Sequence, residues 1–174
     1  MSAATASPLA EPAARVRLLV LDVDGVLTDG RLYYGARGEA LKVFHVRDGL
    51  GLKLLAAAGI EVAVISGRRS GMTGRRCREL GVRHLQQGVE DKLAAFKRLS
   101  ARLGVPASEC ACVGDDLPDV PLMREVGLSF AVADSHPEAR SAARVITRLP
   151  GGSGAVREVC DYLLEARRRA ASVT

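Results

Sequence analysis

Aromatic residues and long apolar runs are scarce in this sequence. Its 174 residues include three Phe, three Tyr and no Trp. The core must therefore be built from aliphatic side chains, which favours an α/β architecture over an aromatic-rich β-sandwich. Leu18–Leu21 is among the longest aliphatic runs, far short of the roughly 18 residues that cross a bilayer. We expect no transmembrane segment and no membrane partner.

Cysteine is equally sparse. Cys77, Cys110, Cys112 and Cys160 include no CxxC pair, and a chain of this length buries a core large enough to fold without disulfides. The expectation is reduced, buried thiols in a cytoplasmic protein. Cys110 and Cys112 lie two residues apart and would share one face of a strand, which also permits a metal site there.

We expect no secretory signal at the start of this sequence. The first fourteen residues, MSAATASPLAEPAA, have neither the basic start nor the apolar block of such a signal. We predict that residues 1–14 form a disordered tail and that residues 15–174 form a single domain.

The overall composition is that of a folded protein with a basic charge balance. Hydrophobic residues make up 48% and charged residues 26%, which excludes an intrinsically disordered chain. The net charge of +5 is compatible with nucleic acid, with a small anionic substrate or with neither. Binding of single strands needs stacking rings beside a basic groove, and the few aromatic residues are scattered, so we expect no nucleic-acid partner. The three arginines at 167–169 are interpreted as the solvated last turn of a helix.

Hydrophobic patterning predicts strands that alternate with helices after an early hairpin. The hairpin, a flap over residues 31–46, turns at residues 35–38. In the first predicted helix, Leu50, Leu54 and Leu55 lie on one side and Gly59 ends the helix. The alternation implies right-handed crossovers and a doubly wound, mainly parallel, Rossmann-like α/β sheet without a cap domain. The expected strands are 17–22, 60–65, 83–85, 110–114, 128–132 and 144–147, and the expected helices are 48–58, 70–80, 91–103, 119–126, 137–143 and 154–169.

Two acidic clusters follow predicted strands. Asp22 and Asp24 end the first strand, and Asp115, Asp116 and Asp119 follow the strand at 110–114. Two carboxylates about 4 Å apart repel each other by roughly 4 kcal/mol at a surface-like dielectric, so a cation is expected among them. The carboxyl ends of parallel strands meet at one edge of the sheet, and carboxylate oxygens around an open position suit Mg²⁺. The sequence thus predicts a Mg²⁺ site there, with Mn²⁺ and Co²⁺ as alternatives.

A hydroxyl and an ammonium group accompany these carboxylates. Ser66 ends the second buried strand, where a helix is expected to open, and Lys92 begins a later helix. Both can hold phosphoryl oxygens, Lys92 as a point charge. Each residue also has an ordinary structural interpretation, because Asp or Ser at a strand end often caps a helix and a lysine is usually exposed. The ordered set Asp22, Asp24, Ser66, Lys92 and Asp115 is what predicts phosphoryl transfer.

This set resembles the haloacid dehalogenase superfamily of phosphotransferases, through DVDGVLTDG, Ser66, Lys92 and GDDLPD. The resemblance implies that Asp22 is the nucleophile that forms an aspartyl phosphate. It implies that Asp24 is the general acid and then the base, and that Ser66 and Lys92 hold the phosphoryl group.

The same resemblance implies a ligand set for the cation. Mg²⁺ would be bound by the side chains of Asp22 and Asp115 and by the backbone carbonyl of Asp24. Asp116 and Asp119 would orient water molecules and Lys92.

Within the superfamily, the chain is similar to the 3-deoxy-D-manno-octulosonate 8-phosphate phosphatases over nearly all of residues 15–165. The similarity extends through FHVRDGLGLK, ISGR, AVADSHPEA and GGSGAVREVCDYLL. It implies an Mg²⁺-dependent hydrolase of that eight-carbon sugar-acid phosphate in lipopolysaccharide biosynthesis. It also implies a set of substrate contacts, namely His45, Val46, Arg47, Asp48, Gly49, Lys53, Arg68, Arg76 and Lys92.

The hairpin at 31–46 is too small to cover a site alone. Exposed hairpin edges pair readily with other chains, and the resemblance implies a homotetramer in which hairpins assemble and adjacent subunits cover the sites. Two other functions stay open, a phosphatase for a related nine-carbon sugar-acid phosphate and a catalytically silent regulatory module. The presence of both Asp22 and Asp24 disfavours the silent module, which has no need of a repulsive pair.

Overall fold

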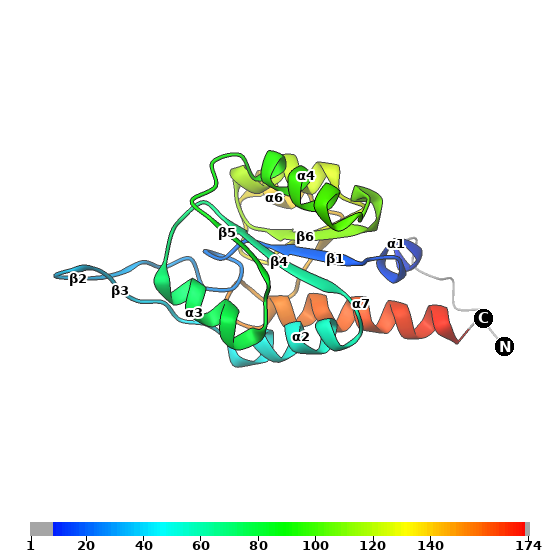
Figure 1. The fold of residues 1–174 in the computed structure, drawn as a ribbon, viewed down its shortest axis with the longest axis horizontal. Helices are drawn as coiled ribbons and strands as arrows, with labels where there is room; N and C mark the ends of the chain where they lie inside the picture. The colour runs from blue at the N-terminus through cyan, green and yellow to red at the C-terminus, as the bar shows by residue number, and fades with distance from the viewer. Residues whose placement is uncertain (1–8, 173–174) are drawn as a thin grey trace.

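The computed structural model describes residues 9–172, which form a central sheet between two layers of helices (Figure 1). In this part of the chain, six parallel strands follow the order β5-β4-β1-β6-β7-β8. This doubly wound order confirms the predicted fold class. The strands are β1 (Leu18–Leu21), β4 (Glu61–Ser66), β5 (His84–Gln87), β6 (Cys110–Gly114), β7 (Leu128–Ala131) and β8 (Val145–Ile146).

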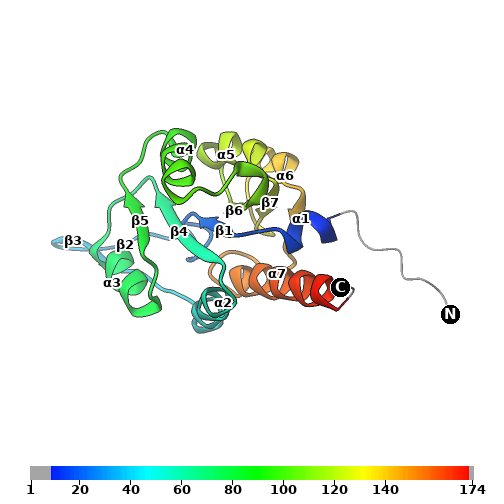
Figure 2. The same cartoon turned by 45° about the vertical axis from the view of Figure 1, so that its right-hand side comes forward.

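Helices cover both faces of the sheet because its strands carry apolar side chains on both faces. Along β1, Leu19 and Leu21 pack into one apolar cluster, while Leu18 and Val20 pack into the other, as the two-residue period of a strand requires. Figure 2 shows α4, α5 and α6 over one face and α2 and α7 over the other. The helices are α1 (Ala10–Ala14), α2 (Val46–Ala57), α3 (Gly71–Leu80), α4 (Lys92–Leu103), α5 (Val120–Glu125), α6 (Pro137–Ala142) and α7 (Ala155–Ala171), with 3₁₀ turns η1 (Ala107–Glu109) and η2 (Leu117–Asp119).

Helix α1 departs from the predicted disordered tail. Residues 1–8 of that tail lie outside the described residues, but Ala10–Ala14 form a helix that packs on α7. Ala13 is fully buried there. Alanine-rich segments have high helix propensity, and the apolar face of α7 supplies the packing that a five-residue helix needs in order to form.

Helix α2 begins two residues earlier than predicted. Its first residue is Val46, and His45 is the N-cap, with Nδ1 accepting the backbone N–H of Arg47 at 3.2 Å. The hairpin is correspondingly shorter than residues 31–46. Its strands are β2 (Tyr33–Gly35) and β3 (Gly38–Leu41), and the pair projects from the carboxyl edge of the main sheet (Figure 1).

The buried face of α2 also differs from the predicted one. Leu55 is buried as expected, but Leu50 and Leu54 are exposed, and Leu52 is buried in their place. The cause is α7, which lies against α2 so closely that a Cβ at Gly51 would come within 3.0 Å of Cys160. Which face of α2 is buried is therefore decided by the partner helix, not by the leucine spacing.

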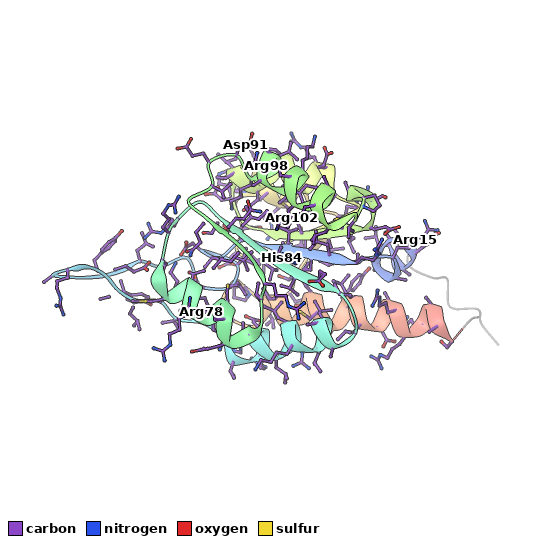
Figure 3. The ribbon with its side chains drawn as sticks, in the orientation of Figure 1. Arg15, Arg78, His84, Asp91, Arg98 and Arg102 are labelled. Atoms are coloured by element: carbon purple, nitrogen blue, oxygen red, sulfur yellow. The ribbon has the colours of Figure 1, made fainter. Side chains whose placement is uncertain are left out.

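Basic side chains are spread over several elements, as Figure 3 shows for Arg15, Arg78, Arg98 and Arg102. At the end of α7, Arg168 and Arg169 pair with Glu165 at 2.5 and 2.6 Å, which confirms the helical interpretation of the arginine run. Among the described residues, no helix combines the length and the apolarity needed to cross a bilayer.

Candidate active site

Three strands bring their last residues to one edge of the sheet. Leu21 of β1 lies opposite Val64 of β4 and Val113 of β6. Because the strands are parallel, Asp22 leaves β1 between the ends of its two neighbours, where Ser66 ends β4 and Asp115 follows β6. Ligands bind to doubly wound sheets at this kind of edge, where the strand order reverses.

Three carboxylates converge at this edge. Asp22, Asp115 and Asp119 each place an oxygen within 4.8 Å of the others. The convergence of the two acidic clusters is thus confirmed by the tertiary structure. Two backbone features make it possible, since a Cβ at Gly25 would lie 2.0 Å from Asp115 Oδ2 and a Cβ at Gly114 would lie 2.4 Å from the Cβ of Asp119. Gly25 has φ +91°, which also favours glycine.

Asp119 differs from the other two because protein donors occupy both of its carboxylate oxygens. Oδ1 accepts from Lys92 Nζ at 2.6 Å, and Oδ2 accepts the backbone N–H groups of Asp115 and Asp116 at 3.1 and 3.3 Å. By contrast, Oδ1 of Asp22 and Oδ1 of Asp115 are buried without a hydrogen-bond partner among residues 9–172. A buried, unpartnered carboxylate oxygen is costly. This donor set fits a divalent cation between Asp22 and Asp115, with Asp119 supporting the site from behind.

Crowding raises the pKa of both ligand carboxyl groups when no cation is bound. Burial, joined by repulsion from Asp119 and opposed by Lys92, raises the pKa of Asp22 to about 6. Burial and repulsion from Asp22 and Asp119 raise the pKa of Asp115 to about 8. A cation between the two groups favours their charged forms and so lowers both pKa values.

Lys92 is the counter-charge of the site. It is the first residue of α4, where the helix dipole disfavours a cation, yet its side chain is only 4% exposed, with Nζ 2.9 Å from Asp22 Oδ2 and 2.6 Å from Asp119 Oδ1. Burial would lower the pKa of Lys92, but the two carboxylates outweigh it and raise the pKa. The cap of α4 is provided by Asp91, whose side chain accepts the N–H of Ala94 at 2.9 Å. The exposed-lysine alternative is therefore wrong for Lys92.

Ser66 is buried at the end of β4, and its Oγ accepts the N–H of Arg68 at 3.3 Å. The predicted helix does not open directly after it. Helix α3 begins at Gly71 with Ser70 as its N-cap, because residues 67–70 form a loop. The amide groups nearest to Ser66 in sequence therefore belong to this loop instead of the α3 N-terminus.

Asp24 is held by two cations, of which the sequence pointed only to Arg68. Lys42 Nζ lies 2.5 Å from Asp24 Oδ1, and Arg68 Nε lies 3.7 Å from Asp24 Oδ2. Glu39, on β3, pairs with both cations, at 3.6 Å from Lys42 and 3.5 Å from Arg68. Arg68 was predicted to contact substrate, whereas Lys42 and Glu39 carried no signal beyond their charge in an exposed hairpin.

The predicted substrate contacts other than Lys92 lie in different surroundings. Val46, Arg47 and Lys53 are exposed on α2, and His45, Arg68 and Arg76 are partly buried. Arg76, on α3, reaches across Gly49, where a Cβ would come within 2.3 Å of its guanidinium. These contacts stay predictions.

Asp48, another of the predicted substrate contacts, has a carboxyl group that faces the protein interior. It is 1% exposed, and Oδ1 accepts the backbone N–H of Arg157, in the first turn of α7, at 2.8 Å. Burial raises the pKa of Asp48 above its ordinary value. The loop before α7 in turn bonds the β1 loop, with the N–H of Gly152 donating to Val26 O at 2.9 Å. The Asp48 carboxyl group therefore joins α2 to α7, and the contact of Asp48 with substrate stays a prediction.

The thiols give no support to a second metal site. Cys77, Cys110, Cys112 and Cys160 are free and buried, as predicted. Burial raises the pKa of Cys110 to about 11, which disfavours the thiolate that metal binding requires.

Comparison with known proteins agrees with the geometry of this edge. Residues 81–157 match the family of haloacid dehalogenase-like hydrolases. A 3-deoxy-D-manno-octulosonate 8-phosphate phosphatase from Escherichia coli is 52% identical over 155 residues, which cover 89% of this chain and 82% of the relative.

Solved structures are similar over almost the whole chain. The phosphatase of the same name from Moraxella catarrhalis, in complex with a magnesium ion, a phosphate ion and a KDO molecule, is 42% identical with a TM-score of 0.90, over 95% of both chains. The cobalt-bound deoxy-D-mannose-octulosonate 8-phosphate phosphatase from Haemophilus influenzae is 43% identical with a TM-score of 0.88, over 92% of this chain and 94% of the other. The present chain belongs to this phosphatase family, within the haloacid dehalogenase-like hydrolases.

Proposed function

We propose that this protein is an Mg²⁺-dependent phosphatase that hydrolyses 3-deoxy-D-manno-octulosonate 8-phosphate to 3-deoxy-D-manno-octulosonate and phosphate, a step in lipopolysaccharide biosynthesis. The observation that carries the proposal is the pair of buried, unpartnered oxygens on Asp22 and Asp115, beside the buried ammonium group of Lys92. In a family of phosphatases for this sugar acid, such a pair is the arrangement that a metal-assisted attack on phosphate requires.

Asp22 is the nucleophile of the proposed reaction. Its carboxylate attacks phosphorus and forms an aspartyl phosphate, which divides one difficult hydrolysis into two easier steps. Lys92 and the hydroxyl of Ser66 balance and orient the phosphoryl oxygens. Mg²⁺ held by Asp22, Asp115 and the backbone carbonyl of Asp24 supplies Lewis-acid stabilisation of the charge that develops on phosphate.

Asp24 moves the proton in both half-reactions. In the first, it donates a proton to the alkoxide oxygen of the leaving sugar; in the second, it takes a proton from the water that hydrolyses the aspartyl phosphate. Asp119 and Asp116 support the site, since Asp119 fixes Lys92 and the backbone after β6.

Basic side chains of α2, of α3 and of the loop after β4 are proposed to select the substrate. Arg47, Lys53, Arg68 and Arg76 offer cations to the carboxylate and phosphate of a sugar-acid phosphate, and guanidinium groups pair well with both. His45, Val46 and Gly49 belong to the same proposed contact region at the start of α2.

A phosphate-release assay tests the function. The chain is incubated with the eight-carbon substrate and with the related nine-carbon sugar-acid phosphate, each with Mg²⁺ and with EDTA, beside an Asp22→Asn control. The proposal expects release that needs Mg²⁺, needs Asp22 and is faster with the eight-carbon substrate. A preference for the nine-carbon acid would establish the alternative substrate, and no Mg²⁺-dependent release from either would revive the silent regulatory module.

The assembly is proposed to be a homotetramer of chains that each form one domain, to which α1 belongs through its packing on α7. Exposed apolar side chains gather on and beside the hairpin, at Leu32, Tyr34, Leu41 and Val43, and such a strand pair is suited to meeting other copies. A neighbouring subunit would then cover the site and exclude water. Light scattering measures the mass in solution, and a monomer at assay concentration would contradict this assembly. The free thiols are typical of the cytoplasm, the compartment proposed for the enzyme.

A further inference from the structure

We propose that Lys42, on the segment that leads from the hairpin to α2, is a positioning residue for Asp24. It holds one carboxylate oxygen of Asp24, Oδ1, so that the other, Oδ2, is the oxygen that exchanges a proton with the leaving group. The proposal rests on the proposed function only in that Asp24 is the general acid. It gives the hairpin segment a role in the chemistry of its own subunit.

The burial of Lys42 is the first observation. Its side chain is 2% exposed, although Lys42 follows directly after an exposed hairpin strand. A lysine is almost never fully buried without a charged partner, and the partner here is Asp24, with Nζ 2.5 Å from Oδ1. The contact joins residues 18 positions apart, so it depends on the hairpin folding back toward the β1 loop.

The two oxygens of Asp24 are not equivalent. Oδ1 is bonded to Lys42, whereas Oδ2 is buried and has no hydrogen-bond partner in the described part of the chain. Arg68 Nε, likewise without a hydrogen-bond partner there, lies 3.7 Å from Oδ2. Oδ2 is thus left open beside a cation that can attract an anionic substrate.

Glu39 keeps Lys42 and Arg68 in place. Its Oε1 lies 3.6 Å from Lys42 Nζ and 3.5 Å from Arg68 Nη2, and its Oε2 accepts from Ser70 Oγ at 2.5 Å. Ser70 is the N-cap of α3 and donates its backbone N–H to Gln87 Oε1 at 2.8 Å. A chain of polar contacts therefore runs from the end of β5 through the hairpin to Asp24.

The proton balance of the step is simple. As the phosphorus–oxygen bond to the sugar breaks, the proton on Asp24 Oδ2 passes to the leaving oxygen, and Asp24 becomes a carboxylate whose Oδ1 still pairs with Lys42. In the second half-reaction Oδ2 takes a proton from water. Lys42 keeps its own protons throughout and touches no reacting atom.

Lys42→Met tests the proposal because it keeps the aliphatic stem and removes the ammonium group. The readout is kcat/KM for phosphate release from three substrates: the eight-carbon sugar-acid phosphate, a hexose phosphate without a carboxylate, and acetyl phosphate. Both sugars leave as alkoxides that need a proton, whereas acetate leaves as a stable anion. Lys97→Met is the matched control, since Lys97 is an exposed lysine that also pairs with a carboxylate, at 3.3 Å from Glu125.

The expected result is a selective loss. Lys42→Met should lower kcat/KM for both sugar phosphates by roughly 10- to 100-fold, part of the contribution of general acid catalysis, and leave acetyl phosphate near the wild-type value. Lys42→Arg should recover part of the loss, and Lys97→Met should change nothing. An equal loss on all three substrates would assign Lys42 to phosphate binding or folding and overturn the proposal.

Two other results would also overturn it. A loss confined to the sugar-acid phosphate would make Lys42 a contact for the substrate carboxylate, and no loss on any substrate would make the ion pair incidental. Because the hexose phosphate and acetyl phosphate are compared with each other, the role of Lys42 can be judged even if the eight-carbon acid is not the physiological substrate.

Discussion

Asp22 and Asp24 leave the same strand two residues apart, yet different regions of the molecule hold them. Asp22 is held by the core, because its N–H donates to Val113 O in β6 at 3.2 Å and its carboxylate meets buried Lys92 at 2.9 Å. Asp24 is held from the periphery, by Lys42 beside the hairpin and by Arg68 in the loop after β4.

The difference separates two tasks. The nucleophile and the cation site need fixed geometry, which a close-packed sheet edge provides. The proton-transfer group meets the variable part of the substrate, and it is supported by a segment with few apolar contacts. Variants on the Asp22 side should therefore change both catalysis and stability, whereas variants on the Asp24 side should change catalysis more than stability.

The largest expected effect comes from removing the nucleophile. Asp22→Asn should lower kcat by about 10⁴-fold or more on sugar-acid phosphate and on acetyl phosphate alike, because neither can then form the aspartyl phosphate. Phosphate release measures the loss, with circular dichroism as the folding control. Activity within tenfold of wild type would place the nucleophile elsewhere.

Asp24→Asn should act more selectively. It should lower kcat/KM for the sugar-acid phosphate by roughly 10²- to 10⁴-fold and for acetyl phosphate by much less, since only the alkoxide needs a proton. Its melting temperature in Mg²⁺ should stay close to that of the wild type. An equal loss of kcat/KM on both substrates would contradict the separate roles of Asp22 and Asp24.

Comparing Lys92→Met with Lys42→Met tests whether the support of Asp22 matters more for stability than the support of Asp24. The Lys92 variant should lower kcat/KM for all phosphate substrates by about 10²- to 10³-fold. It should also reduce the free energy of unfolding by about 3–5 kcal/mol, because buried Asp119 and Asp22 lose their counter-charge. Urea denaturation in Mg²⁺ measures the free energy of unfolding of both variants. Equal destabilisation by the two substitutions would remove the distinction between core and periphery.

The pH dependence of stability should depend on the cation. The pKa of Asp115 is raised to about 8 in the metal-free fold, so its protonated form stabilises that fold relative to the unfolded chain. This contribution is fully present below the unfolded pKa of about 3.9 and is lost as pH rises toward 8. Asp22, with a pKa raised to about 6, contributes in the same direction.

Melting temperatures in EDTA and in Mg²⁺ check this expectation. The stabilisation by Mg²⁺ should be small at pH 5 and grow toward pH 8, at about 2–4 °C for each kcal/mol in a protein of this size. Asp115→Asn should remove most of this increase in Mg²⁺ stabilisation with pH. A difference between the melting temperatures in Mg²⁺ and in EDTA that is independent of pH would show that the cation does not compete with protons at these carboxylates.

The smallest effect is expected at Asp48. Asp48→Asn keeps an oxygen for the N–H of Arg157 and removes a buried charge, so activity and stability should stay near wild type. Asp48→Ala leaves that N–H without its acceptor and should cost about 1–3 kcal/mol. Thermal unfolding and kcat/KM distinguish this interior role from a substrate contact, for which Asp48→Asn would lower kcat/KM without changing stability.

Much of the fold and the site was readable from the chain because it depends on local pattern. Short, continuous apolar runs located β1, β4 and β6, and the parallel topology that follows from strand–helix alternation brought Asp22, Ser66 and Asp115 to one edge. Lys92 could be assigned to this edge from the sequence because it stands at the start of a predicted helix. By contrast, composition and periodicity do not predict that the hairpin segment folds back toward the β1 loop, so they could not place Lys42 and Glu39 beside Asp24.

The sequence by itself determined the order of strands and helices, the meeting of the acidic clusters and the charge of the groups around them, since each follows from residue type and short-range spacing. Only the tertiary structure decided that Asp119 also accepts the backbone N–H groups of Asp115 and Asp116, that Asp48 faces α7 and that Lys42 reaches Asp24. The reason is physical: hydrogen bonds and ion pairs between distant segments depend on which surfaces pack together, and that is a property of the whole chain.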